Sequence, residues 1–327
     1  MSAPVCGYYG KLPVSPEFLR LHAAGPEMRE LDEWLERGMQ YAKAKSGSDW
    51  PAVLAQADIW NFLIVPAGTG RAVCGAIFAS RDQAGRSFPF LTFLLLERHK
   101  LAPIPWLIPL SCRAFLTQTR QFLQQLRADL DWNAFRARVE ALPTEVDTDA
   151  SLEAGFEDYL SQTTTSAFWR EVSAATDHPE HDGFGLERAV RLHPVGKQSG
   201  GEGSWGLKLP LAQSGNQAET YDLPFWLGLQ ARVHQVKQGT WPALVAFWNR
   251  APSKVEPCVL LSFGRSSPNL TRFIVTPDVQ DNAWYEWQLS EATPSERISA
   301  VPLPLDKGTQ VSGQAEISLK RYLNSIG

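Results

Sequence analysis

The stretch that determines the fold runs from residue 59 to residue 96 and reads IWNFLIVP (59–66), AGTGR (67–71), AVCGAIFAS (72–80), RDQAGR (81–86) and SFPFLTFLLL (87–96). Its three apolar runs, bounded by polar and Gly-containing turns, predict three β-strands. The two turns are too short to hold the crossover helix that a parallel strand pair requires. The stretch therefore predicts an antiparallel meander.

Helices are expected before and after this meander in the sequence. Apolar residues spaced three and four apart predict a helix over 26–45. Asp49-Trp50-Pro51 is a typical start for a second, short helix, with Asp49 as N-cap. A strand over 5–12 precedes these elements, and a helix is expected over 113–130. The first part of the chain is therefore predicted to be an α/β domain of the α+β type, with a largely antiparallel sheet flanked by helices.

The length of the chain predicts a second domain, because 327 residues exceed the size of about 150 residues that is usual for one domain. The acidic, proline-containing stretch PTEVDTDAS (143–151) is the best boundary. We expect a first domain over 1–142, a linker near 143–151 and a smaller α/β domain over 152–327. Its expected elements are helices over 152–160, 168–172, 223–238 and 267–275, and strands over 186–194, 205–212, 242–248, 257–264 and 284–290.

The composition excludes several classes of partner. The chain carries 31 Lys and Arg against 35 Asp and Glu, a formal net charge of −4, which gives no electrostatic attraction to nucleic acid or to an anionic membrane. The longest apolar run, at 88–96, is too short to span a bilayer. The first residues lack the features of a signal peptide, and four cysteines without a CxxC pair are typical of a reducing compartment. We therefore expect a cytoplasmic protein without membrane insertion.

Motifs for catalysis and cofactor binding are missing from the sequence. It contains no phosphate-binding GxxxxGK[ST], no GxGxxG after a strand, no HExxH and no GxSxG. The strongest metal candidate is DHPEHD (177–182) with His193 downstream, but Pro179 interrupts the helix that would align its histidines, so a solvated acidic loop is favoured. The run Thr163–Thr165 fits either a phosphorylation site or, the favoured interpretation, a helix end. These observations favour a binding protein without cofactor or metal over an enzyme.

Several motifs occur in an order that resembles the TagF (ImpM) family of type VI secretion accessory proteins. The family opens with a Gly-Tyr/Phe-Gly-Lys-Leu-Pro segment, has a Trp-Leu-x-x-Gly helix and carries Ser-x-Asp-x-x-Gly-Arg-x-Phe-Pro between two strands. The corresponding stretches here are GYYGKLP (7–13), LDEWLERGM (31–39), the Trp50 helix, IWNFLI (59–64) and CGAIFASRDQAGRSFPF (74–90). The resemblance covers about residues 1–130, with a weaker likeness over 205–290. The chain departs from the family at 14–18, where Val-Ser-Pro-Glu-Phe replaces Ser-Arg-Gly-Asp-Phe.

The resemblance implies a cytoplasmic, non-enzymatic regulator that represses assembly of the secretion machine after translation. It also implies a partner, the forkhead-associated scaffold protein of that system. Some relatives are fused to a metal-dependent phosphatase, but no paired aspartate motif of such an enzyme occurs here. The alternative function is a hydrolase that uses an acid–His pair assembled from both halves, such as Asp82 with a distant histidine.

The candidate site residues lie in two motifs. One is GYYGKLP (7–13), in the strand expected over 5–12, and the other contains the last turn of the meander (81–86). Two interpretations remain open for them: they bind the partner, or they hold the loop and the first strand together. Asp82 and Arg86 are close enough in sequence to pair, Gly85 would supply a positive φ, and Lys11 is expected to be exposed at the mouth of the loop. The candidates are Gly7, Tyr8, Gly10, Lys11, Leu12, Pro13, Asp82, Gly85, Arg86, Phe88 and Pro89.

Overall fold

The computed structural model of the chain describes residues 4–66, 68–97, 105–126, 131–148, 150–174, 206–213, 219–233, 244–252, 256–263, 268–275, 284–286 and 317–325. The expected strand over 186–194 and the candidate metal loop with His193 lie outside these residues. Within them, no helix combines the length and the apolar character needed to cross a membrane.

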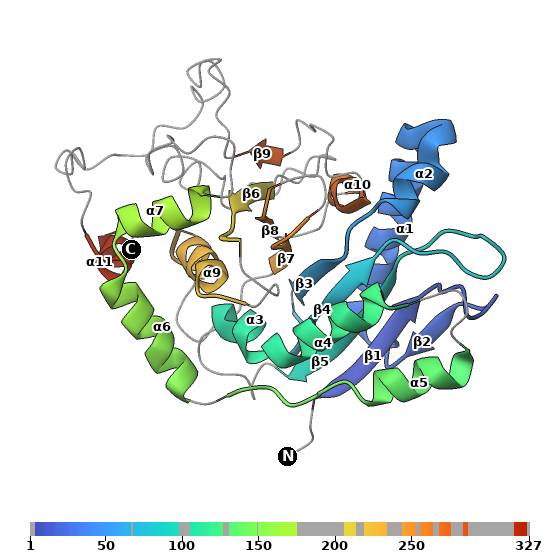
Figure 1. The fold of residues 1–327 in the computed structure, drawn as a ribbon, viewed down its shortest axis with the longest axis horizontal. Helices are drawn as coiled ribbons and strands as arrows, with labels where there is room; N and C mark the ends of the chain where they lie inside the picture. The colour runs from blue at the N-terminus through green and yellow to red at the C-terminus, as the bar shows by residue number, and fades with distance from the viewer. Residues whose placement is uncertain are drawn as a thin grey trace.

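The strands of the described residues form one nine-stranded sheet in the order β2-β1-β5-β4-β3-β7-β8-β6-β9 (Figure 1). Neighbouring strands are antiparallel except β6 and β9, which are parallel. The strands are β1 (Val5–Gly10), β2 (Leu19–Leu21), β3 (Trp60–Val65), β4 (Arg71–Phe78), β5 (Phe90–Glu97), β6 (Gly206–Pro210), β7 (Leu244–Asn249), β8 (Cys258–Phe263) and β9 (Trp284–Glu286).

The antiparallel meander predicted from residues 59–96 is confirmed. β3 pairs with β4 through Trp60↔Ile77, and β4 pairs with β5 through Phe78↔Phe90. All residues of β3 are buried, as expected for a strand covered on both faces. Together with the flanking helices, these pairings confirm the α+β fold class.

The sheet does not stop at the expected linker. β3 pairs with β7 over five residue pairs, from Asn61↔Trp248 to Val65↔Leu244. Strands from before and after the acidic stretch 143–151 therefore share one sheet. Whether 1–142 and 152–327 fold as independent units stays a prediction.

Helices cover both faces of the sheet (Figure 1). α1 and α10 pack together on one face, where an added Cβ on Gly38 would lie 2.0 Å from the Thr271 hydroxyl, and α2 packs against them. The other face carries helices from both parts of the chain. The helices are α1 (Pro26–Ser46), α2 (Trp50–Ala55), α3 (Ile108–Ser111), α4 (Arg113–Gln124), α5 (Trp132–Glu140), α6 (Ala150–Gln162), α7 (Thr165–Ser173), α9 (Asp222–Val233), α10 (Pro268–Val275) and α11 (Leu319–Ser325), with 3-10 turns η1 (Gly47–Asp49) and η3 (Pro105–Leu107).

Two details differ from the expected elements. The helix expected over 113–130 ends at Gln124, and the short elements β2, α3, α5 and α11 were not anticipated. Thr164 is the N-cap of α7 and its hydroxyl accepts from the Ala167 N–H at 3.2 Å, in agreement with a helix-end position.

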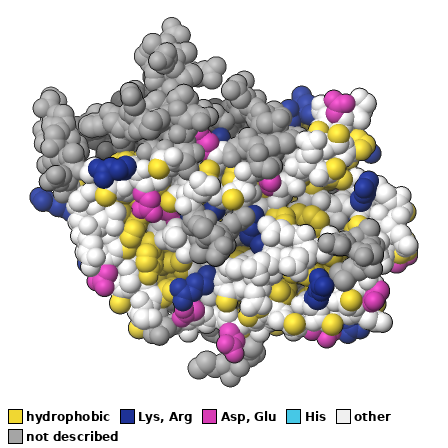
Figure 2. Space-filling model, viewed as in Figure 1, with side chains coloured by type: hydrophobic (Ala, Val, Ile, Leu, Met, Phe, Trp, Pro, Cys, Tyr) yellow, Lys and Arg dark blue, Asp and Glu magenta, His cyan; other side chains and the backbone are white. Residues whose placement is uncertain are grey.

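Positive and negative side chains are interspersed over the face seen in Figure 2.

Candidate functional site

The two candidate motifs meet at one end of the sheet. Gly10, the last residue of β1, pairs with Phe90, the first residue of β5. This pairing places the segment after β1 beside the connection between β4 and β5, which carries Asp82 and Arg86. Further contacts join the two motifs, including the Gln83 N–H donated to the Ser15 carbonyl at 3.1 Å. Residues about 70 positions apart in the sequence therefore form one corner of the molecule.

The Asp82 carboxylate is the centre of this corner. Its side chain is fully buried and receives four donors. Oδ1 accepts from the backbone N–H groups of Ala84 at 3.0 Å and Arg86 at 2.8 Å. Oδ2 accepts from the Arg86 Nε at 2.7 Å and lies 3.2 Å from the Lys11 Nζ. One carboxylate thus stabilises both the turn that follows it and the end of β1.

Arg86 connects the turn to the segment after β1. Besides its bond to Asp82, its guanidinium donates to the Pro16 carbonyl, within the segment 14–18 where the sequence departs from the family. The expected pair with Asp82 is present, although 61% of the Arg86 side chain is exposed. A backbone carbonyl accepts this bond, so the contact does not depend on which side chains occupy positions 14–18.

Lys11 differs from its expected position. Only 16% of its side chain is exposed, and the ammonium group lies beside Asp82 rather than in solvent at the mouth of the loop. The physical reason is the buried Asp82 carboxylate, which needs a countercharge that a solvent-facing lysine would not supply. Among the candidate residues, Lys11 therefore belongs to the internal contacts of the corner.

The environment of Asp82 keeps it ionised. Burial alone would raise its pKa, but the hydrogen bonds from Arg86 and Lys11 favour the charged form and lower the pKa below its usual value. A carboxylate with a lowered pKa and four donors is a weak proton acceptor at neutral pH. This chemistry suits a structural anion better than the acid–base role that the hydrolase alternative would give Asp82.

Two glycines of the motifs have conformations that require glycine. Gly10 has φ +127°, and an added Cβ would lie 2.0 Å from the Pro89 carbonyl oxygen. Gly85 has the expected positive φ, +80°, with open space around it. The first glycine permits close approach of two backbones and the second permits the turn.

The remaining candidates are mostly buried. Tyr8 packs edge-on against Phe135 of α5, with ring centroids 5.3 Å apart. Phe88 is half-buried and packs against Phe18, with ring centroids 5.1 Å apart. The other buried candidates are Gly7, Leu12 and Pro89, while Pro13 is half-buried. Apart from the exposed part of Phe88, these side chains hold the corner together from the inside and leave little surface for a partner.

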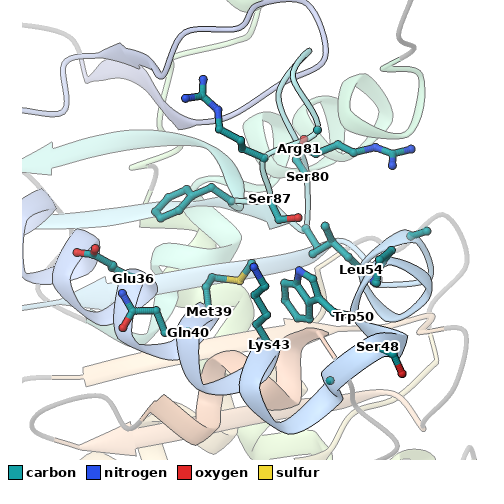
Figure 3. A pocket seen from close by; sticks show the side chains of 17 residues that line it. Glu36, Met39, Gln40, Lys43, Ser48, Trp50, Leu54, Ser80, Arg81 and Ser87 are labelled. Carbon is teal, nitrogen blue, oxygen red and sulfur yellow. The ribbon is translucent and has the colours of Figure 1, made fainter.

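An open pocket of about 900 Å³ adjoins the corner (Figure 3). α1, the η1–α2 segment and the β4–β5 connection line it. In Figure 3 the Trp50 ring and the Lys43 side chain point from the helices toward the connection that carries Ser80 and Ser87. The lining combines apolar and charged side chains: Met39, Trp50, Leu54, Phe88, Glu36, Lys43, Arg81 and Arg86.

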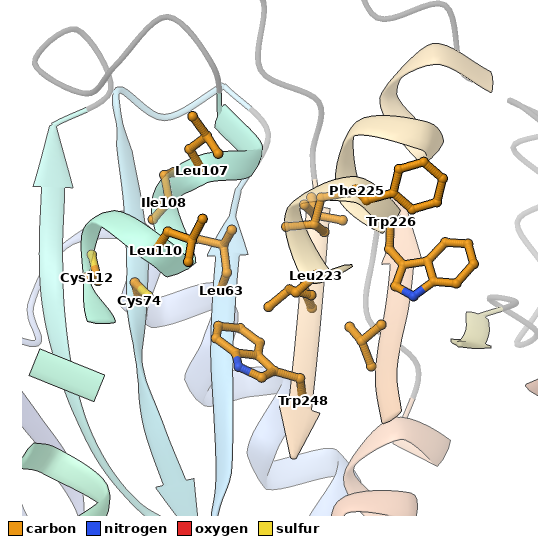
Figure 4. Close-up of a cluster of buried hydrophobic side chains, with 14 of the residues drawn as sticks. Leu63, Cys74, Leu107, Ile108, Leu110, Cys112, Leu223, Phe225, Trp226 and Trp248 are labelled. Carbon is orange, nitrogen blue, oxygen red and sulfur yellow. The ribbon is translucent and has the colours of Figure 1, made fainter. Parts of the chain in front are cut away.

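Neither this pocket nor a buried ionic group in the second half of the chain was predicted from the sequence. Arg250 is 1% exposed and donates two hydrogen bonds to Asp222, at 2.7 and 2.9 Å. Its Nε lies 3.5 Å from Glu219, which accepts from the Trp248 indole at 2.8 Å. Figure 4 shows Trp248 among side chains from both parts of the chain, including Leu63 and Leu223. No pattern in the sequence marks a charged residue that follows a strand as buried.

The same surroundings shift the pKa values of the two acids in opposite directions. Burial raises the pKa of Glu219, although Arg250 and the hydrogen bond from Trp248 oppose the change. Burial also acts on Asp222, but the bidentate bond to Arg250 outweighs it and lowers the pKa. Within the described residues, no group of three or more His, Cys, Asp and Glu side chains is arranged to hold a metal ion.

Arg86→Ala is expected to lower the free energy of unfolding by about 1 kcal/mol. This is below the usual range for a charged hydrogen bond, because the side chain is largely exposed and Lys11 still neutralises Asp82. Thermal or chemical denaturation measures the loss, with Arg138→Ala on exposed α5 surface as the control. Equal stability of the Arg86→Ala variant and the wild type would contradict a bracing role for Arg86.

Comparison with known proteins assigns the corner to a family. A family model described as the TagF N-terminal domain, type VI secretion system-associated, matches residues 7–142. The crystal structure of PA0076 from Pseudomonas aeruginosa PAO1 is similar in fold, with a TM-score of 0.51 and 17% sequence identity over 85% of this chain and 96% of that chain. No curated protein matches the chain. Residues 7–142, which include the whole corner, therefore form a TagF N-terminal domain, a domain associated with type VI secretion systems.

Proposed function

We propose that this protein is a cytoplasmic regulator that represses assembly of the type VI secretion system after translation. It acts by binding the forkhead-associated scaffold protein of that system and not by catalysis. The family assignment supports the link to type VI secretion. The resemblance of the motifs to the family, including the Ser80–Pro89 signature, supports repression and the choice of partner.

One observation carries the binding role. The family motifs build a rigid corner in which Asp82 is saturated with donors, and beside this corner lies the open pocket. A carboxylate held in this way fixes the backbone of the loop and leaves no free acid for proton transfer. Rigid loops that present an open surface are typical of binding sites, since little entropy is lost when the partner docks.

A calorimetric titration of the full chain with the purified scaffold protein tests the proposal. We expect a saturable complex of defined stoichiometry. In cells that carry an active secretion system, raised levels of the chain should lower the amount of secreted substrate without lowering the amounts of the system's components. Absence of binding to the scaffold protein would refute the proposed mechanism.

A further inference from the structure

We propose that the pocket between α1, α2 and the β4–β5 connection binds an acidic segment of the scaffold protein. In this arrangement a carboxylate of the segment lies at the cations of the pocket, and a neighbouring apolar side chain packs against its apolar wall. The inference rests on the proposed function, because it assigns a surface to the partner named there.

The charges of the pocket lining are the first argument. The residues that line the pocket include three cations, Lys43, Arg81 and Arg86, and one acid, Glu36. Arg86 is bonded to Asp82, whereas neither Lys43 nor Arg81 has an acidic partner in the part of the chain that the structure describes. The protein as a whole carries a formal charge of −4, so the local excess of positive charge at the pocket is opposite in sign to the net charge of the protein. Complementary charge of this kind selects an acidic partner and speeds its approach.

The apolar wall is the second argument. Met39, Trp50 and Leu54 line the pocket from α1 and α2, and Phe88 lines it from the connection. Met39, Trp50 and Leu54 are largely buried and Phe88 is half-buried, so a free carboxylate or phosphate ion would make no apolar contact with what remains exposed, whereas a peptide can place an apolar side chain against it. The Trp50 indole N–H is buried and has no acceptor among the described residues.

The stiffness of the connection is the third argument. Arg81 and Ser87 form a bridge, the Asp82 N–H donates to the Arg86 carbonyl at 3.0 Å, and the Phe88 N–H donates to the Ser80 carbonyl at 3.0 Å. These bonds close the connection around the Asp82 carboxylate and fix the backbone that carries Arg81. A pocket whose wall is already ordered binds more tightly than one that must be ordered by its ligand.

The test is a titration of the scaffold protein with matched double variants. Lys43→Glu/Arg81→Glu reverses the two cations without acidic partners in the pocket. Arg29→Glu/Arg138→Glu makes the same change in net charge, from −4 to −8, at exposed positions on α1 and α5 outside the pocket. All four side chains are exposed, so melting temperatures should stay close to the wild-type value. We expect the pocket variant to bind about tenfold more weakly or worse, and the control variant to bind like the wild type.

Salt provides a second readout. Binding by the wild type should weaken as ionic strength rises, and this dependence should be smaller in the pocket variant because the attracting charges are gone. If the wild type binds and both double variants bind equally well, or are weakened equally, the pocket assignment is wrong while the proposed function stands. If the wild type fails to bind the scaffold protein, both the pocket assignment and the proposed function are wrong. A wild-type dimer in light scattering that is lost in the pocket variant would assign the pocket to a second copy of this chain and overturn the inference.

Discussion

Arg250→Met is expected to destabilise the protein by about 3–5 kcal/mol, the usual cost of removing one partner from a buried ion pair. The variant leaves Asp222 without its bidentate donor and Glu219 without its countercharge, and both acids are almost completely buried. The long apolar side chain of methionine fills much of the space, so the loss arises mainly from uncompensated charge. Chemical denaturation of the full chain measures it.

The pH dependence identifies the cause of this loss. Without Arg250, burial raises the pKa of both acids, and an acid whose pKa is raised by folding binds more protons in the folded state than in the unfolded state. The stability deficit of the variant should therefore shrink as the pH is lowered from 7 toward 5. A double variant that also replaces Asp222 with Leu should recover part of the loss. A deficit that is independent of pH would indicate lost packing instead of unpaired charge.

Asp82→Ala is expected to lower the free energy of unfolding by about 2–3 kcal/mol, and so to exceed the effect of Arg86→Ala. It removes the acceptor of four donors and leaves the largely buried Lys11 ammonium without a countercharge. Because the Arg86 side chain is largely exposed, water screens its interaction with Asp82, and the expected loss of stability is smaller than for a fully buried ion pair. Asp82→Asn retains an oxygen for the two backbone N–H groups and should cost about half as much. An Asp82→Ala variant as stable as the wild type would show that this carboxylate does not hold the corner.

The lowered pKa of Asp82 sets the direction of a pH effect. Because the folded-state pKa lies below the unfolded value of about 3.9, the carboxylate contributes stability that is fully present above that value. This contribution is lost as the pH falls through the folded pKa. The stability difference between wild type and Asp82→Asn should therefore be constant above about pH 5 and decrease below about pH 4.

The predictable part of the fold is the local part. Short turns between apolar runs are sufficient to predict the β3–β5 meander, and three–four spacing is sufficient for α1. The pairing of β3 with β7 joins residues more than 170 positions apart. All residues of both strands are buried, and a strand covered on both faces has no alternation of polar and apolar residues that would indicate its neighbour.

The candidate site shows the same limit. Asp82 and Arg86 were identified through the resemblance to the family signature, and their closeness in sequence was sufficient to predict that they pair. The burial of Lys11 and Arg250 was not predictable, because cationic side chains are mostly exposed and only distant acids explain their positions. The pocket escaped detection since α1, α2 and the β4–β5 connection form it only after they have packed together.

Hydrogen–deuterium exchange of the full chain, alone and in complex with the forkhead-associated scaffold protein, tests most directly whether the partner binds at this corner. We expect slower exchange in the complex for peptides covering 36–55 and 79–88, which line the pocket. Peptides from α6 (Ala150–Gln162) serve as the internal reference and should exchange at an unchanged rate. Formation of the complex with unchanged exchange over 36–55 and 79–88, and with protection elsewhere, would show that the partner does not bind at this corner.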